Sequence, residues 1–288
     1  MSVRNTKTLH KELPRIVIKE MVIRALEEDL AAGDVTTEAC IDDNSNSVAN
    51  AVARHDLIAC GSNVAACVFE MVDPDLKFEE LIADGTSVQK GQILWRVTGK
   101  TRSILMGERV ALNFVQRLSG IATMTHTYVK AIPPGFHTRI SDTRKTTPGL
   151  RAFERYAVRM GGGFNHRDNL SSAVLIKDNH IAACGGVTTA IKRAKTYASH
   201  TCRIECEVET LEQLKEALDV GVDVVLLDNM PPLSIVEAVK LAKGRAIIEA
   251  SGGITLTHIE ELARAGVDVI STGAITHSAP AADIGLDM

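Results

Sequence analysis

The second half of this 288-residue chain repeats a strand-then-helix pattern, and this repetition restricts the fold more than any other feature. Helical segments with one apolar face, such as that of Leu211, Leu214 and Leu218, separate short runs of branched residues. Gly221 and Gly266 stand where such helices would end and the next strand would begin. Units this short predict right-handed crossovers between parallel, buried strands. The predicted strands cover residues 136–143, 173–179, 203–208, 222–228, 246–250 and 267–271.

Polar residues gather at the carboxyl ends of these predicted strands. In an α/β barrel the carboxyl ends of the strands form a single rim, which is where active sites lie. We therefore predict that the strands close into a barrel rather than an open sheet. The residues at this rim are Arg144, Lys145, Lys177, Glu207, Asp228, Ser251 and Ser271.

The first third of the chain does not show this repeated strand-then-helix pattern. Residues 12–30 have the pattern of an amphipathic helix, and Asp34 in the GDVTT that follows is a candidate helix cap or turn residue. Alternating segments over residues 47–60 and 92–98 predict strands, with a turn-rich stretch over 84–91 between them. This part is predicted to be an α+β domain.

That domain is expected to end near Gly107, and a helix over residues 108–117 is expected to lead into the barrel. No further strand-helix unit follows Gly273, so the chain end is expected to pack back on the first domain. The predicted domains are residues 1–111, the barrel over 112–274, and a tail over 275–288.

Composition narrows the class of protein. No run reaches the ~18 apolar residues of a membrane helix, and the first residues lack the apolar centre of a secretory signal. We therefore expect a cytoplasmic protein that does not bind membranes. The six cysteines form no C-x-x-C pair and are expected to be reduced and mostly buried. A net charge of −4 gives no general attraction to nucleic acid.

One segment has a net positive charge, although the chain as a whole is acidic. Residues 139–178 hold eight basic side chains against four acidic ones. A cationic island on an acidic protein favours a small anionic ligand, because proteins that bind polyanions carry a broader basic face. A solvated helix face is the alternative.

Thr143, Arg144 and Lys145 follow directly after a predicted strand. An arginine binds a carboxylate or phosphate through two parallel hydrogen bonds, and a lysine adds a compact charge beside it. This loop is therefore a predicted anion site. A glycine triplet further along allows close backbone approach to a ligand, and His166 and Arg167 after it add donors. His166 is expected to orient substrate before any role in proton transfer.

Lys177 ends the apolar run AVLI. A lysine at a strand end contacts phosphate or acts as an amine nucleophile, and we favour phosphate binding. Glu207 and Asp228 end the next two strands, where carboxylates would hold Mg²⁺, through water or directly, or bind ribose hydroxyls. A structural ion pair with Lys177 is the alternative for these acids. Glu205 and Glu209 lie on the same side of the strand as Glu207, which leaves the leading carboxylate open.

Glycine-rich loops follow the last two predicted strands. Such loops bind phosphate in α/β barrels through backbone N–H groups at a helix start. The ligand is therefore expected to carry a phosphate. The loops contain Ser251, Gly252 and Gly253 after one strand, and Ser271, Thr272 and Gly273 after the next.

A series of motifs makes the chain resemble the quinolinate phosphoribosyltransferase family of type II phosphoribosyltransferases. They occur in the order EDLAAGDVTT, ERVALNFVQRLSGIAT, DTRKTTPGLRAFERYAVRMGGGFNHR, AVLIKDNHI, IECEVE, LLDNM, EASGGI and STGAIT, over most of the chain. The resemblance implies an α/β fold with an N-terminal α/β sandwich domain and an irregular, seven-stranded α/β barrel. It also implies a homo-oligomer, either a dimer or a hexamer. Asp168 and Ser172 depart from the family pattern, in which an apolar residue and an aspartate are common.

The resemblance implies a role for each cationic residue of the site. Arg109, in ERVALN, would reach into the neighbouring subunit's site to bind quinolinate. Arg144, His166 and Arg167 would be the other contacts of the two carboxylates. Lys145 and Lys177 match ligands of phosphate or pyrophosphate.

The remaining matches concern the sugar and the metal. Glu207 and Asp228 match the carboxylates around ribose and Mg²⁺, and the two glycine loops match the cradle of the 5′-phosphate. Lys145, Lys177 and these two acids are the predicted catalytic residues.

The implied reaction transfers phosphoribosyl from phosphoribosyl pyrophosphate to quinolinate with decarboxylation. Its products are nicotinate mononucleotide, CO₂ and pyrophosphate, in de novo NAD biosynthesis, and its cofactor is Mg²⁺. Two alternatives keep the barrel: a Schiff-base aldolase that uses Lys177, and a non-catalytic paralogue that binds a phosphoribosyl ligand.

Overall fold

The structure is a computed structural model that describes residues 12–288. The chain divides into two compact units. One unit runs up to His126 and includes Thr147–Gly162 and Ser278–Met288. The other consists of Thr127–Thr146 and Gly163–His277. The predicted domain limits after residues 111 and 274 stay predictions.

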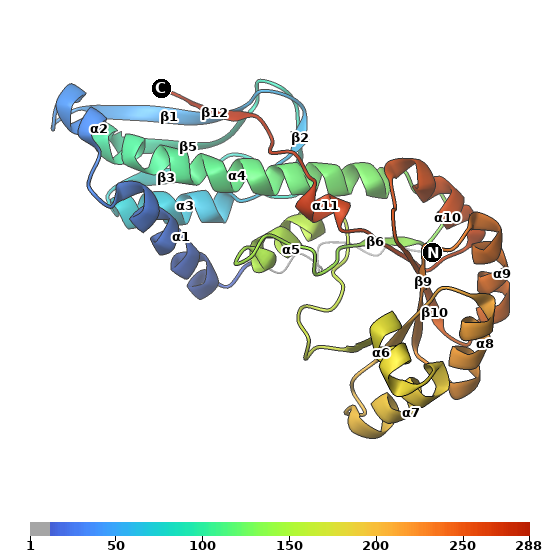
Figure 1. Cartoon of the computed structure of the whole chain (residues 1–288). Helices are drawn as coiled ribbons and strands as arrows, with labels where there is room; N and C mark the ends of the chain where they lie inside the picture. Colours follow the sequence, from blue (N-terminus) through green and yellow to red (C-terminus); the bar gives the residue numbers. More distant parts are fainter. Residues whose placement is uncertain (1–11) are drawn as a thin grey trace. The chain divides into compact units, whose positions relative to one another are not determined.

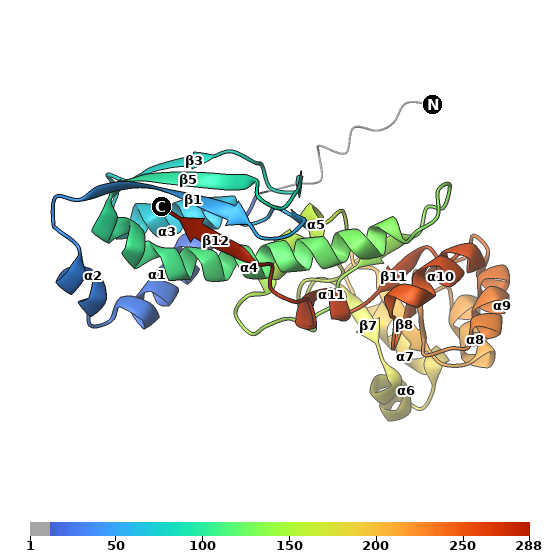
Figure 2. The same ribbon diagram turned by 90° about the horizontal axis from the view of Figure 1, so that it is seen from above.

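The first unit contains a four-stranded antiparallel sheet in the order β12-β1-β5-β3, and a two-stranded sheet of β2 and β4. The alternating segments predicted as strands are confirmed as β1, β2 and β5. The last strand of the chain, β12, pairs with β1 from Asn50↔Asp287 to Ala53↔Ile284 (Figure 2). The strands are β1 (Asn46–Ala53), β2 (Leu57–Ile58), β3 (Lys77–Glu80), β4 (Ser87–Val88), β5 (Ile93–Lys100) and β12 (Ile284–Asp287).

Helices cover one face of this sheet. Figures 1 and 2 show α3 and α4 along it. The rings of Phe69, Phe78 and Trp95 pack together with centroids 5.2–6.2 Å apart, and Phe69 and Trp95 are buried. The prediction that Asp34 caps a helix is confirmed, since its Oδ1 accepts the Thr37 N–H at 3.0 Å. The helices are α1 (Arg15–Leu30), α2 (Val35–Cys40), α3 (Ser62–Val72), α4 (Thr101–Lys130) and α5 (Arg151–Met160).

The predicted break at Gly107 is wrong, because α4 is 30 residues long and passes through it. A Cβ on Gly107 would lie 2.9 Å from the ring of Phe69. A Cβ on Gly120, in the same helix, would lie 2.0 Å from the carbonyl oxygen of Pro280. Both glycines therefore allow other segments to approach the helix and do not end it.

The second unit is built on a six-stranded parallel sheet in the order β6-β11-β10-β9-β8-β7. All six strands predicted from the sequence are confirmed, most of them with narrower limits. Gly221 and Gly266 end α8 and α10 in the left-handed region, with φ of 76° and 89°, as predicted. The strands are β6 (Arg139–Ser141), β7 (Val174–Ile176), β8 (Ile204–Val208), β9 (Val224–Asp228), β10 (Ile247–Ser251) and β11 (Val269–Ser271).

Helices form an outer layer around this sheet (Figure 1). They alternate with the strands along the chain, as right-handed crossovers between parallel strands require. The helices are α6 (Asp178–Cys184), α7 (Val187–Tyr197), α8 (Leu211–Val220), α9 (Pro232–Ala242), α10 (Ile259–Ala265) and α11 (Ala274–His277), with a 3₁₀ turn, η2 (Leu256–His258).

A further parallel segment lies beside β6. Phe164 forms a parallel bridge with Ser141, in which the Phe164 N–H donates to Ile140 O at 2.8 Å and the Asp142 N–H donates to Phe164 O at 3.1 Å. The glycines before Phe164 and the polar residues after it limit this pairing to one bridge.

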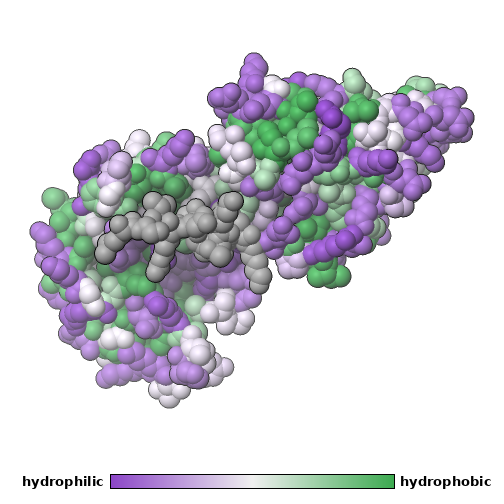
Figure 3. All heavy atoms as spheres, turned by 180° about the vertical axis from the view of Figure 1, so that it is seen from behind, coloured by the Kyte–Doolittle hydropathy of each residue, from purple (hydrophilic) through white to green (hydrophobic). Residues whose placement is uncertain are grey.

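The surface and the cysteines fit the composition. Within residues 12–288, no helix is long and apolar enough to cross a membrane. One face of the molecule carries mainly hydrophilic side chains, with separate apolar patches between them (Figure 3). All six cysteines are free, as predicted, but only Cys60, Cys67 and Cys206 are buried, so the prediction that most are buried is wrong.

A buried ion pair ties the start of α5 to α4 within the first unit. The Glu154 side chain is fully buried, and its Oε1 accepts Arg117 Nη2 at 2.7 Å and Thr147 Oγ1 at 2.8 Å. Its Oε2 accepts the Thr147 N–H at 3.1 Å. Glu154 therefore fixes the residues that follow the predicted anion loop.

We expect Glu154→Ala to lower the free energy of unfolding by roughly 3–5 kcal/mol, because it removes the acceptor of a buried charge pair. Urea unfolding followed by circular dichroism measures the change. Glu260→Ala is the matched control, since its pair with Arg264 is exposed and should contribute at most about 1 kcal/mol. Equal losses in the two variants would contradict this account of the Glu154 pair.

Candidate active site

A cavity of about 560 Å³ opens at the carboxyl ends of the strands of the second unit. The positions predicted from the strand ends and loops meet there, although they are far apart in the sequence. The predicted residues that line it are Thr143, Arg144, Lys145, His166, Arg167, Lys177, Glu207, Asp228, Ser251, Gly252, Gly253 and Ser271.

Three predicted residues lie outside this lining. Arg109 is exposed on α4, in the first unit. Thr272 and Gly273 are buried behind the loop that follows β11. Gly273 still affects the cavity, because a Cβ there would lie 2.9 Å from Cδ of Lys145. Its lack of a side chain leaves room for the lysine.

Four lining residues were missed by the sequence reasoning: Leu175, Leu226, Asn229 and Glu249. A sequence signal existed for Glu249, which precedes Ser251 by two residues and so shares its side of β10. For Asn229 no local signal was available.

Asn229 explains why the loop after β10 contains glycine. It is the single non-glycine residue with positive φ, 51°, in the described part of the chain. Its N–H donates to Ser251 O at 3.1 Å, and its side chain lies over Gly252, where a Cβ would be 2.3 Å from Asn229 Oδ1. Gly252 also has φ of 91°, so both space and backbone conformation require glycine there.

Two guanidinium groups contribute to the cavity wall. Arg144 Nε is buried and makes no hydrogen bond within residues 12–288. Arg167 donates from Nη1 to Ala173 O at 3.2 Å. Burial and the nearby charge of Arg144 lower the pKa of Arg167. An anionic ligand between these groups would relieve their repulsion and give Arg144 an acceptor.

Lys177 and Glu207 form an ion pair at the mouth, with 2.6 Å between Nζ and Oε2. The lysine side chain is 46% exposed and the glutamate 10%. The structural pair considered as an alternative thus exists, and Lys177 remains open to solvent for a ligand. Glu209, the competing carboxylate, is exposed and does not line the cavity.

A second, buried group of acids lies on β8 and β10. Glu205 and Glu249 are buried, and His166 Nε2 lies 3.2 Å from Glu205 Oε2 and 3.4 Å from Glu249 Oε1. Burial disfavours charge on His166, but its hydrogen bonds with the two carboxylates raise its pKa to about 10. Burial raises the pKa of Glu205. The hydrogen bond with Glu205 therefore favours retention of the proton on Nε2.

The other ring nitrogen decides where that proton sits. His166 Nδ1 accepts the backbone N–H of Arg167 at 2.8 Å. A backbone N–H cannot accept a proton in turn, so Nδ1 is unprotonated and the imidazole carries its proton on Nε2.

Asp142 fixes the same loop from the end of β6. Its carboxylate is fully buried, and it accepts the His166 N–H at 2.7 Å and Asn165 Nδ2 at 2.6 Å. The residues of the NHR sequence are thus held by a charge-assisted network rather than by regular strand pairing.

The acids at the mouth fit a magnesium ion. Glu207 and Asp228 both line the cavity and offer carboxylate oxygens, the ligands that Mg²⁺ prefers. Mg²⁺ is commonly held by one or two carboxylates together with substrate phosphates, so a site of this kind needs no larger cluster. The deeper group of His166, Glu205 and Glu249 also has metal-ligand atoms within 4.8 Å of one another, but its atoms already bind each other.

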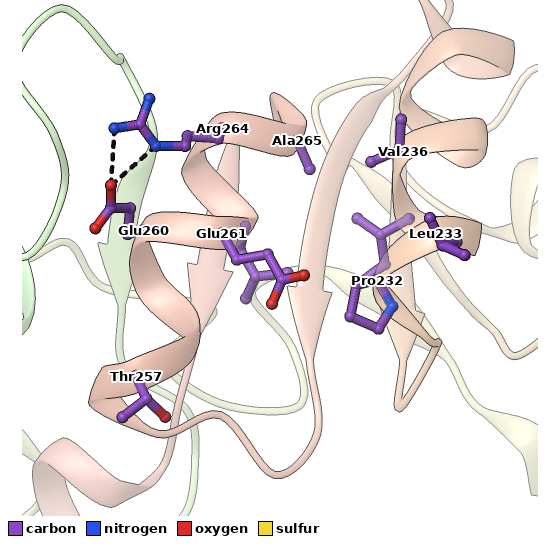
Figure 4. Close-up of a pocket in the computed structure, with 10 residues that line it drawn as sticks. Pro232, Leu233, Val236, Thr257, Glu260, Glu261, Arg264 and Ala265 are labelled. Atoms are coloured by element: carbon purple, nitrogen blue, oxygen red, sulfur yellow. Dashed lines mark hydrogen bonds and ion pairs between the residues drawn. The ribbon is translucent and has the colours of Figure 1, made fainter.

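A separate groove lies between α9 and α10 (Figure 4). Pro232, Leu233 and Val236 line one side, and the exposed pair of Glu260 and Arg264 lies on the other. It contains none of the residues at the strand ends. Its chemistry therefore offers no match for a phosphorylated substrate.

Known proteins resemble this chain along most of its length. Residues 34–119 match the model of the quinolinate phosphoribosyl transferase N-terminal domain, and residues 121–287 match that of the C-terminal domain. A probable nicotinate-nucleotide pyrophosphorylase [carboxylating] of Bacillus subtilis is 42% identical over 94% of this chain and 93% of its own length. Quinolinate phosphoribosyltransferase [decarboxylating] 2b of Nicotiana tabacum is 42% identical over 95% of this chain and 82% of its own.

Solved structures give the same result. NadC from Streptococcus pyogenes has a TM-score of 0.93 and 41% identity, covering 96% of this chain and 98% of that one. The nicotinate-nucleotide pyrophosphorylase from Francisella tularensis has a TM-score of 0.92 and 39% identity, with coverage of 96% and 97%. The chain belongs to the quinolinate phosphoribosyl transferase family.

Proposed function

We propose that this chain transfers the phosphoribosyl group of phosphoribosyl pyrophosphate to quinolinate with decarboxylation. The products are nicotinate mononucleotide, CO₂ and pyrophosphate, in de novo NAD biosynthesis. Family membership supports this reaction, as do the names of the relatives. The observation that carries the proposal is one cavity in which Arg144, Arg167 and Lys177 meet at the strand ends.

The charges of the reactants match this cavity. Quinolinate carries two carboxylates, and phosphoribosyl pyrophosphate carries several more negative charges. Bringing them together requires concentrated cations in a site of reduced dielectric. Arg144 and Arg167 would bind the dicarboxylate, while Lys145 and Lys177 would bind phosphate or pyrophosphate.

The glycine loops suit the 5′-phosphate. Ser251, Gly252 and Gly253 line the cavity after β10, and Ser271 lines it after β11. Backbone N–H groups of such loops bind phosphate without a large side chain in the way. Thr272 and Gly273 would contribute their backbone, and the missing side chain of Gly273 leaves space for Lys145.

The chemistry needs a nucleophile, a leaving group and stabilisation of the electron pair left by decarboxylation. The ring nitrogen of quinolinate attacks C1 of the ribose as the bond to pyrophosphate breaks. When the neighbouring carboxylate leaves as CO₂, the positive pyridinium nitrogen stabilises the electron pair left on the ring carbon, and that carbon takes a proton from water. Glu207 and Asp228 lie where carboxylates would favour a positively charged sugar centre. These two residues would hold Mg²⁺, which neutralises pyrophosphate when bound.

Three finer features are part of the proposal. The segment at Phe164 would act as the seventh strand of an irregular barrel, next to β6. The active form would be a homo-oligomer, a dimer or a hexamer, in which Arg109 completes the partner's site. The protein would act in the cytoplasm.

The two alternatives predicted from the sequence fit the cavity less well. A Schiff-base lysine needs an apolar, desolvated setting, whereas Lys177 is half-exposed and pairs with Glu207. A non-catalytic paralogue would have little use for two carboxylates at the reacting centre. Borohydride trapping of substrate on Lys177 would favour the aldolase.

Arg144→Ala should lower kcat/KM for quinolinate roughly 10- to 100-fold, because it removes a hydrogen-bonded charge worth about 1.5–3 kcal/mol. Release of pyrophosphate and formation of the pyridine mononucleotide, followed together, give the rate. Lys192→Ala removes an exposed charge of α7, away from the cavity, and should leave the rate unchanged. A wild-type protein that prefers nicotinate to quinolinate, or an Arg144→Ala variant as active as Lys192→Ala, would overturn the assignment.

Removal of divalent metal by EDTA should abolish turnover, and Mg²⁺ should restore it. Glu207→Gln should raise the Mg²⁺ concentration for half-maximal rate by roughly tenfold, since the site loses a carboxylate charge. Glu209→Gln is the control from the same part of the chain, because Glu209 is exposed. Full activity in EDTA would reject the metal requirement.

Mixed oligomers test the role of Arg109. Arg109→Ala and Lys177→Ala should each be nearly inactive alone. Unfolding and refolding them together should restore about a quarter of the wild-type rate, because half the dimers are mixed and each mixed dimer has one intact site. Mixtures no more active than their components would show that Arg109 does not serve the partner.

A further inference from the structure

The proposed chemistry at the mouth of the cavity does not use Glu205 and Glu249, although burying their charges is energetically costly. Glu205 is 6% exposed and Glu249 is 4% exposed. Within residues 12–288, no salt bridge joins either acid to an arginine or lysine, although the charge of Arg167 lies near Glu205. Their shared neighbour within 3.4 Å is Nε2 of His166. Such a pair of acids on one imidazole indicates that the orientation of His166 matters.

The two acids approach His166 from different strands. In register, Glu205 lies opposite Val224 of β9, while Glu207 and Glu249 lie opposite Leu226. Glu205 is therefore one inward-facing position deeper than Glu207. His166 turns Nε2 toward these acids and Nδ1 toward the backbone of Arg167.

We propose that Glu205 and Glu249 are positioning residues that act on the substrate through His166 and Arg167. Glu205 accepts the Nε2–H, Glu249 lies beside it with its Oε1 3.4 Å from Nε2, and Nδ1 accepts the backbone N–H of Arg167, whose guanidinium lies at the cavity. The inference rests on the proposed function, because Arg167 is taken to bind the dicarboxylate. It assigns His166 to positioning, in place of the direct substrate contact predicted from the sequence.

Two further contacts support this arrangement. Asp142 accepts the His166 N–H at 2.7 Å, so the peptide units on both sides of His166 are fixed by side chains. Arg167 Nη1 donates to Ala173 O at 3.2 Å, which fixes the far end of the arginine. A guanidinium held at its backbone and at one nitrogen needs little reordering when a carboxylate binds.

The tautomer of His166 in the wild-type protein gives the first test. Two-bond ¹H–¹⁵N spectra of protein with ¹⁵N-labelled histidine rings should show His166 protonated on Nε2 and unprotonated on Nδ1 at neutral pH. His166→Asn identifies the signal by its loss. The same pattern is expected in EDTA and in Mg²⁺. A proton on Nδ1, or loss of the Nε2 proton when Mg²⁺ is added, would overturn the proposal.

Two substitutions at His166 separate the ring nitrogens. In His166→Asn the amide oxygen takes the place of Nδ1 and can accept the Arg167 N–H. In His166→Gln the amide nitrogen takes the place of Nε2 and can donate to Glu205, but Nδ1 is lost. KM for quinolinate should rise roughly 10- to 100-fold in His166→Gln and much less in His166→Asn. The reverse order would contradict the proposal.

Coupling to Arg167 completes the test. Glu205→Leu should raise KM for quinolinate about tenfold and leave KM for phosphoribosyl pyrophosphate within about threefold. Glu205→Gln keeps an acceptor oxygen and should largely restore the value. In an Arg167→Ala background, Glu205→Leu should have no further effect, since both act through one side chain. Additive effects, or equal changes in both KM values, would reject the role of Glu205.

These outcomes are distinct from failure of the proposed function. If the wild-type protein did not turn over quinolinate, the proposed function would be rejected, while the His166 tautomer would still test the positioning role. If the wild-type protein turned over quinolinate but the effects of Glu205→Leu and Arg167→Ala were additive, the function would stand and the positioning role would be rejected. Where a variant unfolds, as judged by circular dichroism, the wild-type tautomer alone decides.

Discussion

The balance between buried carboxylates and concentrated cations determines the chemistry of the second unit. Parallel strands bring Glu205, Glu207 and Glu249 together on one sheet, with Glu207 and Glu249 at one level and Glu205 one inward-facing position below. Glu207 pairs with Lys177, and Glu205 and Glu249 lie against His166. The guanidinium groups of Arg144 and Arg167 are left facing the cavity with Arg144 Nε lacking an acceptor within residues 12–288. The two carboxylates of a dianionic substrate supply the negative charge that pairs with these guanidinium groups.

The fold places these charges because parallel strands end at the same edge of a sheet. Each of β6, β7, β8, β9, β10 and β11, or the loop after it, contributes a lining residue. Glycine has two uses here. Gly252 accommodates the side chain of Asn229, and Gly273 leaves space for that of Lys145. Larger residues at either position would displace a functional loop.

Most of this arrangement follows from local sequence pattern. Strand limits and the helix ends at Gly221 and Gly266 depend on neighbours in sequence, and so were predictable. The predicted helix limits of 108–117 were wrong, because α4 continues through Gly107, whose role depends on Phe69. The partners of the deep acids also lay beyond local pattern, since His166 meets Glu205 and Glu249 only through the tertiary fold. Asn229 has positive φ, for which its sequence neighbours give no sign.

The central claim is that one cationic cavity joins two acidic reactants and drives decarboxylation through the pyridinium that results. Its most direct test follows the purified protein with quinolinate labelled with ¹³C in the carboxyl group next to the ring nitrogen, phosphoribosyl pyrophosphate and Mg²⁺. The account predicts labelled CO₂, pyrophosphate and nicotinate mononucleotide in equal amounts, and none of them without phosphoribosyl pyrophosphate. Pyrophosphate release with the label retained in the mononucleotide, or labelled CO₂ without phosphoribosyl pyrophosphate, would contradict it.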